Sequence, residues 1–249
     1  MKRILLLLVL GLFLSFRVKS QNLMDKGNML YQKGDYSGAA KEYEQILKEE
    51  LVAPELYFNL GNAYYKLNNI PEAILYYEKA KKIAPADEDV DFNLRMANLK
   101  VVDKVSALPD IFYKKYYYSI VQTFSSSFWA RLSIISVWLG VFCAVFFILS
   151  QAPVFKRLFF YLGLLLFLSG ISCFFFAGSS YQTETASDSG VLFPTSIYVK
   201  GSPDEKSTDL FILHEGVKVK IMDELNGWKR IRISNGNEGW VPASSIQTI

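Results

Sequence analysis

The sequence predicts a multidomain membrane protein, in which an all-α repeat domain, a two-helix transmembrane hairpin and a small all-β barrel follow one another along 249 residues. Three observations lead to this prediction. Two long stretches contain no charged residue, an N-terminal segment repeats with a period of 34 residues, and the C-terminal segment has short strand-like runs separated by Asn-Gly pairs. A single soluble globular domain is therefore excluded.

Two uncharged stretches predict the membrane-spanning part. Residues 132–155 and 158–183 contain no Asp, Glu, Lys or Arg, which makes gaps of 24 and 26 residues. A helix needs about 20 apolar residues to cross a bilayer. We therefore expect transmembrane helices at 132–149 and 158–178, joined by a short, positively charged turn at 151–157. Small residues recur at every fourth position of both helices and would allow close packing, although such residues are common in membrane helices generally.

The first 20 residues have the pattern of a secretory signal peptide. Lys2 and Arg3 precede an uncharged run at 4–16, and small or β-branched residues stand before Gln21. We expect cleavage after this segment, with an uncleaved signal anchor as the alternative. An exported N-terminus puts the turn at 151–157 in the cytosol, as the positive-inside rule favours. Both soluble parts would then face the periplasm from the inner membrane.

The segment at 105–131, before the first crossing, is predicted to be an amphipathic juxtamembrane helix. Its aromatic residues, Tyr117 and Phe124 among them, recur at helical spacing, and Trp129 stands near its end. Such a helix suits the headgroup layer of a membrane. A simple linker is the alternative.

Charge and composition limit the function. The net charge of +3 comes from the leader and the membrane-flanking segments, because residues 21–104 carry −3 and residues 178–249 carry −2. We therefore expect no nucleic-acid partner. The only histidine, His214, is expected in a surface loop, and the sequence has neither a glycine-rich phosphate loop nor clustered metal ligands. We predict that the protein is not an enzyme and uses no cofactor or metal.

The repeat lies within residues 21–104. The segments that coincide after a shift of 34 residues are Gly27-Asn28 with Gly61-Asn62, Tyr31 with Tyr65, Tyr43 with Tyr77, and Phe58-Asn59-Leu60 with Phe92-Asn93-Leu94. The period and these residues resemble the tetratricopeptide repeat, which implies a solenoid of antiparallel helix pairs. We expect two such repeats followed by a capping helix.

The resemblance also implies a ligand face. Tetratricopeptide solenoids hold an extended peptide or a partner helix against their inner face, which would be lined here by Met24, Asn28, Tyr31, Phe58, Asn62, Tyr65, Phe92 and Met96. The alternative is that these side chains only pack the next helix. Met24, Asp89 and Asn93 occupy the positions where carboxylate-clamping members carry basic residues. We therefore do not expect the C-terminal carboxylate of a chaperone as the ligand.

Residues 189–249 are predicted to form the β barrel. Asn226-Gly227 and Asn235-Gly236 separate strand-like runs, and this dipeptide favours tight hairpins. Together with Gly239-Trp-Val-Pro242, these runs resemble a bacterial SH3 domain. The resemblance implies a ligand face that includes Tyr198, Trp228 and Pro242, with cell-wall peptide as the suggested ligand. Trp240 could also belong to this face, but we expect it in the barrel core.

The order of the parts resembles, as a whole, the BatE family encoded in aerotolerance operons of Bacteroidota. That resemblance implies a non-catalytic scaffold of the inner membrane that acts beside von Willebrand-type membrane proteins and a MoxR-type ATPase. The alternative is a cell-envelope anchor or sensor that binds peptidoglycan through the barrel. Fold-level analogy carries both functional expectations.

Overall fold

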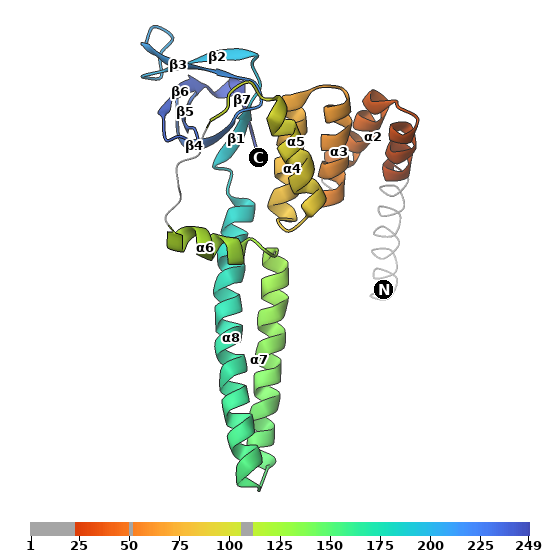
Figure 1. Ribbon diagram of the computed structural model, residues 1–249, viewed down its shortest axis with the longest axis vertical. Coiled ribbons are helices and arrows are strands. Elements are labelled where there is room, and N and C mark those ends of the chain that lie inside the picture. Colours follow the sequence, from red (N-terminus) through yellow and green to blue (C-terminus); the bar gives the residue numbers. More distant parts are fainter. Residues whose placement is uncertain (1–22, 50–51, 106–111) are drawn as a thin grey trace, which may run out of the picture. The chain divides into compact units, whose positions relative to one another are not determined.

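The computed structural model describes residues 23–49, 52–105 and 112–249. The predicted signal peptide, residues 1–20, lies outside this part. The chain forms two compact units, one with the helical repeats and the β domain and one with the long apolar helices (Figure 1). Each unit is described by itself below.

The helical part of the first unit follows the 34-residue period. Its helices are residues 23–32, α2 (Tyr36–Lys48), α3 (Pro54–Lys66), α4 (Ile70–Ile83) and α5 (Glu88–Lys100). Capping residues mark the starts of two helices. Asp35 accepts a hydrogen bond from the Gly38 N–H at the start of α2, and Asp87 accepts from the N–H groups of Asp89 and Val90 at the start of α5. Two complete helix pairs and a fifth helix are therefore present, as the repeat predicts.

Close helix contacts explain the repeated glycines. A Cβ atom on Gly61 would lie 2.5 Å from the ring of Tyr77, and one on Gly27 would lie 2.4 Å from the ring of Tyr43. Both tyrosines are buried. A glycine is therefore needed at each position, because a buried ring from the second helix of the pair fills the space that any larger residue's side chain would need.

The C-terminal part of the first unit is an antiparallel β domain. Its strands are β1 (Ser189–Leu192), β2 (Ser196–Lys200), β3 (Asp209–His214), β4 (Lys218–Leu225), β5 (Trp228–Arg232), β6 (Glu238–Pro242) and β7 (Ile246–Thr248). They form one sheet in the order β3-β2-β6-β5-β4-β1-β7. The β4–β5 turn uses Asn226 and Gly227, both with positive φ, which confirms the predicted Asn-Gly hairpin.

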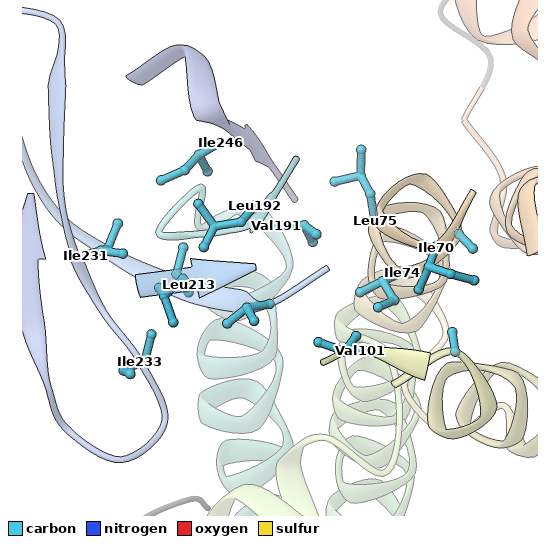
Figure 2. Packing of buried hydrophobic residues seen from close by; sticks show 14 of the residues in the cluster. Ile70, Ile74, Leu75, Val101, Val191, Leu192, Leu213, Ile231, Ile233 and Ile246 are labelled. Atoms are coloured by element: carbon cyan, nitrogen blue, oxygen red, sulfur yellow. The ribbon is translucent and has the colours of Figure 1, made fainter. Parts of the chain in front are cut away.

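One hydrophobic core joins the β domain to α4 and α5. Figure 2 shows Val191 and Leu192 of β1 together with Ile74 of α4 and Val101 after α5 (Figure 2). Ile74 and Val191 are completely buried. The sequence predicts two separate modules, whereas the structure gives them a common core.

The second unit contains α6 (Phe112–Val121), α7 (Ser126–Leu149) and α8 (Pro153–Thr185). Both α7 and α8 are long and apolar enough to cross a membrane. They extend beyond the predicted 132–149 and 158–178. At the end of this pair away from the connecting turn, Glu184 of α8 accepts hydrogen bonds from the backbone N–H and the hydroxyl of Ser126, at the start of α7.

The predicted juxtamembrane helix at 105–131 is divided in two, and its residues 106–111 lie outside the described part of the chain. Only α6 is separate, because the helix breaks between Val121 and Ser126 and the remainder, with Trp129, belongs to α7. The indole N–H of Trp129 donates to the carbonyl oxygen of Val121 at 3.0 Å, and its ring packs edge-on against Phe176 of α8. Figure 1 shows α6 running across the end of the α7–α8 pair.

Small residues allow α7 and α8 to approach closely along part of their contact. The Ser133 hydroxyl donates to the Gly170 carbonyl oxygen at 2.8 Å, and a Cβ on Gly163 would lie 3.3 Å from the Cβ of Cys143. Cys143 and Cys173 are both free thiols. The two cysteines lie at different levels along the helix pair, because Cys143 lies beside Gly163, ten positions before Cys173 in the sequence.

The Gly61 contact can be tested by adding one methyl group. We expect Gly61→Ala to destabilise the repeats by about 1–3 kcal/mol, because the Tyr77 ring must move. The measurement is thermal unfolding of the full chain in detergent, followed by helical circular dichroism. Gly178→Ala is the control, since Gly178 is also helical but has no heavy atom within 4 Å of an added Cβ. Equal unfolding temperatures for the two variants would contradict the assigned contact.

Candidate protein-binding groove

A pocket of about 290 Å³ lies on the repeat domain. Its lining residues come from the helix at 23–32, α3, α4 and α5, and are Tyr31, Asn62, Tyr65, Lys66, Tyr77, Phe92, Asn93 and Met96. Five of the eight residues predicted for the inner face are therefore brought together here. We call this pocket and the helix surfaces that line it the groove.

A hydrogen-bond network joins Asn62, Tyr77 and Asn93 of the groove, and the same network occurs once more in the repeats. Asn62 Oδ1 accepts from the Tyr77 hydroxyl at 2.7 Å and from Asn93 Nδ2 at 2.8 Å. The corresponding bonds 34 residues earlier run to Asn28 Oδ1, from the Tyr43 hydroxyl at 2.7 Å and from Asn59 Nδ2 at 3.2 Å. Each asparagine therefore links the two helices of its repeat to the first helix of the next.

Burial raises the pKa of the tyrosines in these networks. It raises the pKa of Tyr43 to about 12, with a smaller contribution from Tyr31. Burial likewise raises the pKa of Tyr77 well above its ordinary value. Both hydroxyls are donors at neutral pH, as an ordinary tyrosine is, and each needs an acceptor because an unpaired buried hydroxyl is costly. Asn28 and Asn62 supply that acceptor.

The walls of the groove combine exposed aromatic rings with amides and amines. Phe92 is 53% exposed, although it is a large apolar side chain. Lys100 Nζ lies 4.2 Å from the centre of the Tyr65 ring, and Lys66 lines the pocket from α3. Within the described residues, Asn62 Nδ2 has no hydrogen-bond acceptor, so it remains available to a ligand. The groove can therefore bind an apolar side chain, a carbonyl group and a negative charge.

Sequence reasoning missed part of this groove. Lys66, Tyr77 and Asn93 line it but were not among the predicted ligand residues. The period itself could have indicated the basic edge, because Lys66 and Lys100 are 34 residues apart and so occupy equivalent positions on α3 and α5.

The other three predicted residues lie outside the pocket. Asn28 has the structural bonds described above, Met24 is half-buried against the core of the first repeat, and the Phe58 ring lies 6.1 Å from that of Tyr77. These contacts correspond to the alternative stated for the face, in which side chains pack the neighbouring helix.

A second candidate surface lies on the outer face of β2, β6 and β5. Trp228 pairs with Pro242 and Arg230 with Trp240 in the β5–β6 register, whereas the intervening Val241 is completely buried. Trp240 is therefore not a core residue, contrary to expectation. It lies on the same outer face as Trp228 and Pro242, because alternate residues of a strand share one face.

Tyr198 and a charged cluster extend this surface. Tyr198 is 53% exposed on β2, and Lys200, two residues later, pairs with Trp240. Glu238 forms ion pairs with Arg230 and Arg232. Hydrogen bonds from Arg232 and then Arg230 hold the pKa of the Glu238 carboxyl below its usual value. The outer face therefore combines three aromatic rings with basic groups.

His214 is half-buried at the end of β3 and does not lie in the surface loop that the sequence suggested. Its backbone N–H donates to Asp103 at 2.6 Å, and its ring Nδ1 lies 2.9 Å from the same carboxylate. Asp103 follows α5, so this contact joins the β domain to the repeats.

Comparison with known proteins agrees with both folds. Residues 24–88 match the family model described as tetratricopeptide repeat, and residues 195–247 match the one described as bacterial SH3 domain. None of the curated proteins compared with the chain matches it. The chain therefore combines two kinds of domain that typically bind other molecules and do not catalyse reactions.

The network around Asn62 predicts a structural role that can be separated from ligand binding. We expect Asn62→Leu to destabilise the repeats by about 1–3 kcal/mol, because the Tyr77 hydroxyl loses its acceptor in a buried site. Thermal unfolding of the full chain measures the loss. Tyr77→Phe combined with Asn62→Leu should recover part of it, since no unpaired hydroxyl then remains. No recovery in the double variant would contradict this explanation.

Proposed function

We propose that the protein is a non-catalytic scaffold of the inner membrane that binds a protein segment in the groove of its tetratricopeptide domain. The supporting observation is the exposed Phe92 beside the basic Lys66 and beside Asn62 Nδ2, which has no acceptor among the described residues. Exposed aromatic residues beside polar groups are typical of binding surfaces. We expect the bound segment to present a large apolar side chain and a carboxylate.

The resemblance to BatE extends this proposal. It suggests that the bound partners are membrane proteins of the von Willebrand type or components of a MoxR-type ATPase system, in a complex connected with aerotolerance or stress. Two long apolar helices and a matched bacterial SH3 domain support an envelope location. In this proposal both soluble domains face the periplasm, and only the turn between α7 and α8 is cytosolic.

The alternative function is an envelope anchor or sensor that binds peptidoglycan through the SH3 domain. The observation that favours it is the outer face with Tyr198, Trp228 and Trp240, since aromatic rings stack readily on sugar and peptide groups. The two functions use different surfaces and can be separated experimentally.

The groove can be tested by photocrosslinking in native membranes. We expect Phe92→Ala and Lys66→Glu to reduce partner capture at least about fivefold each, since either change removes a binding group from the pocket. Captured proteins are identified by mass spectrometry. Leu99→Ala is the matched control, because Leu99 also lies exposed on α5 but does not line the pocket. A partner set unchanged in both groove variants, with wall fragments captured through the outer face, would instead favour the anchor.

The proposed topology can be tested by cysteine labelling in a background without Cys143 and Cys173. A cysteine in place of Thr195, in the exposed β1–β2 connection, should react with a membrane-impermeant maleimide in cells whose outer membrane alone is opened. Ala152→Cys, in the turn between α7 and α8, should react only after the inner membrane is disrupted. The reverse pattern would show that the assigned orientation is wrong.

A further inference from the structure

The repeat domain ends after the first helix of a third pair. The next helix in the chain, α6, belongs to the other compact unit. Repeats of this kind bury their apolar faces only against neighbours, so the last face needs a cover. That face is formed by α4 and α5, and its apolar residues are Ile70, Ile74, Leu75, Leu94, Ala97 and Val101.

In the first repeat, the equivalent face is covered by α3, the first helix of the next repeat. Ala40 of α2 stands 34 positions before Ile74 and is buried in a cluster with Leu56, Leu60 and Ala63 of α3. In the second repeat the equivalent surface is just as well buried, since Ile74 is completely inaccessible and Leu75 is 2% exposed. The covering residues come from the β domain and include Val217. Figure 2 shows two others, Val191 and Leu192 of β1.

The closest approach is made by backbone. A Cβ on Gly216, in the β3–β4 turn, would lie 3.0 Å from Val101 Cγ2 and 3.3 Å from Ile74 Cδ1. The φ angle of Gly216 is +84°, and its N–H donates to Leu192 at 2.8 Å. The turn therefore fits against α4 and the end of α5 because this position has no side chain.

Polar contacts flank this apolar contact. Lys218 Nζ lies 2.7 Å from Glu78 Oε2, and Glu78 is only 9% exposed. A carboxylate so far removed from water requires a partner. A second polar contact joins Asp103, in the segment after α5, to His214 at the end of β3. The contact thus has a buried apolar cluster, with the Lys218–Glu78 ion pair and the His214–Asp103 hydrogen bonds beside it, as a specific interface does.

We infer that the SH3 domain occupies the place of the missing second helix of the third repeat and acts as the terminal cap of the solenoid. Its contact with the repeats is then a fixed part of the fold, and the two domains move as one body. The cap also holds α5, whose Leu94 and Ala97 face the shared core while Phe92, Asn93 and Met96 face the groove. This inference does not depend on the proposed function.

A pair of matched variants tests the cap. Asparagine tolerates positive φ, so Gly216→Asn adds a side chain at the contact with little backbone strain. Gly227→Asn is the control, because Gly227 has a φ of +80° but no heavy atom within 4 Å of an added Cβ. Hydrogen exchange with mass spectrometry is measured on the full chain in lipid nanodiscs.

We expect Gly216→Asn to lower the protection of the α4 and α5 amides by at least about tenfold, with β5 and β6 unchanged. Gly227→Asn should leave α4 and α5 protected. If α5 keeps its protection in Gly216→Asn while the variant turn is displaced, the cap inference is wrong.

A second set of variants covers the case in which Gly216→Asn unfolds the β domain itself. Lys218→Glu and Glu78→Lys should each reduce the protection of α4, and the double variant should restore most of it. This pattern requires the two side chains to meet in the native protein. Single variants without effect, or a double variant as damaged as the singles, would overturn the inference.

Discussion

The hydrophobic core shared by α4, α5 and the β domain is the constraint on which the first unit depends. An open solenoid end would expose Ile70, Ile74 and Val101 to water, at roughly 1.5–3 kcal/mol for each large side chain. The β domain removes these side chains from water. The pocket wall on α5 is therefore supported from both sides, by α3 through the asparagine network and by the β domain through the core.

The asparagine networks fix the spacing of the repeat helices, and the one around Asn62 lines the groove. Asn62 and Asn28 hold buried tyrosine hydroxyls across the helix pair, so their first role is to maintain the spacing of the helices. The residues best placed to contact a ligand are at the walls, where Phe92 is exposed and Lys66 and Lys100 form a basic edge. This division separates residues that shape the groove from those that would recognise a partner.

The second unit is held together by different interactions from the first. Its two long helices are apolar on their outer surfaces, and their mutual contact depends on Ser133, Gly170 and other small residues that allow the backbones to approach. A hydroxyl-to-carbonyl bond such as that of Ser133 is worth about 0.6 kcal/mol in a membrane, so close packing supplies most of the contact. At the end away from the connecting turn, Glu184 satisfies the first N–H group of α7 that a helix leaves unpaired.

The sequence by itself determined the helix pairs, the apolar hairpin and the Asn-Gly turn of the β domain. These features depend on local rules: a repeat period, a stretch without charge, and a dipeptide that accepts positive φ. It also indicated five of the residues that line the groove.

Only the tertiary structure decided that Trp240 faces outward, that His214 meets Asp103, and that Gly216 packs against Ile74 and Val101. His214 and Asp103, for example, are more than 100 positions apart in the sequence. No periodicity or local propensity encodes such pairs, because they arise when the last face of the solenoid is buried and the β domain is the part of the chain that covers it.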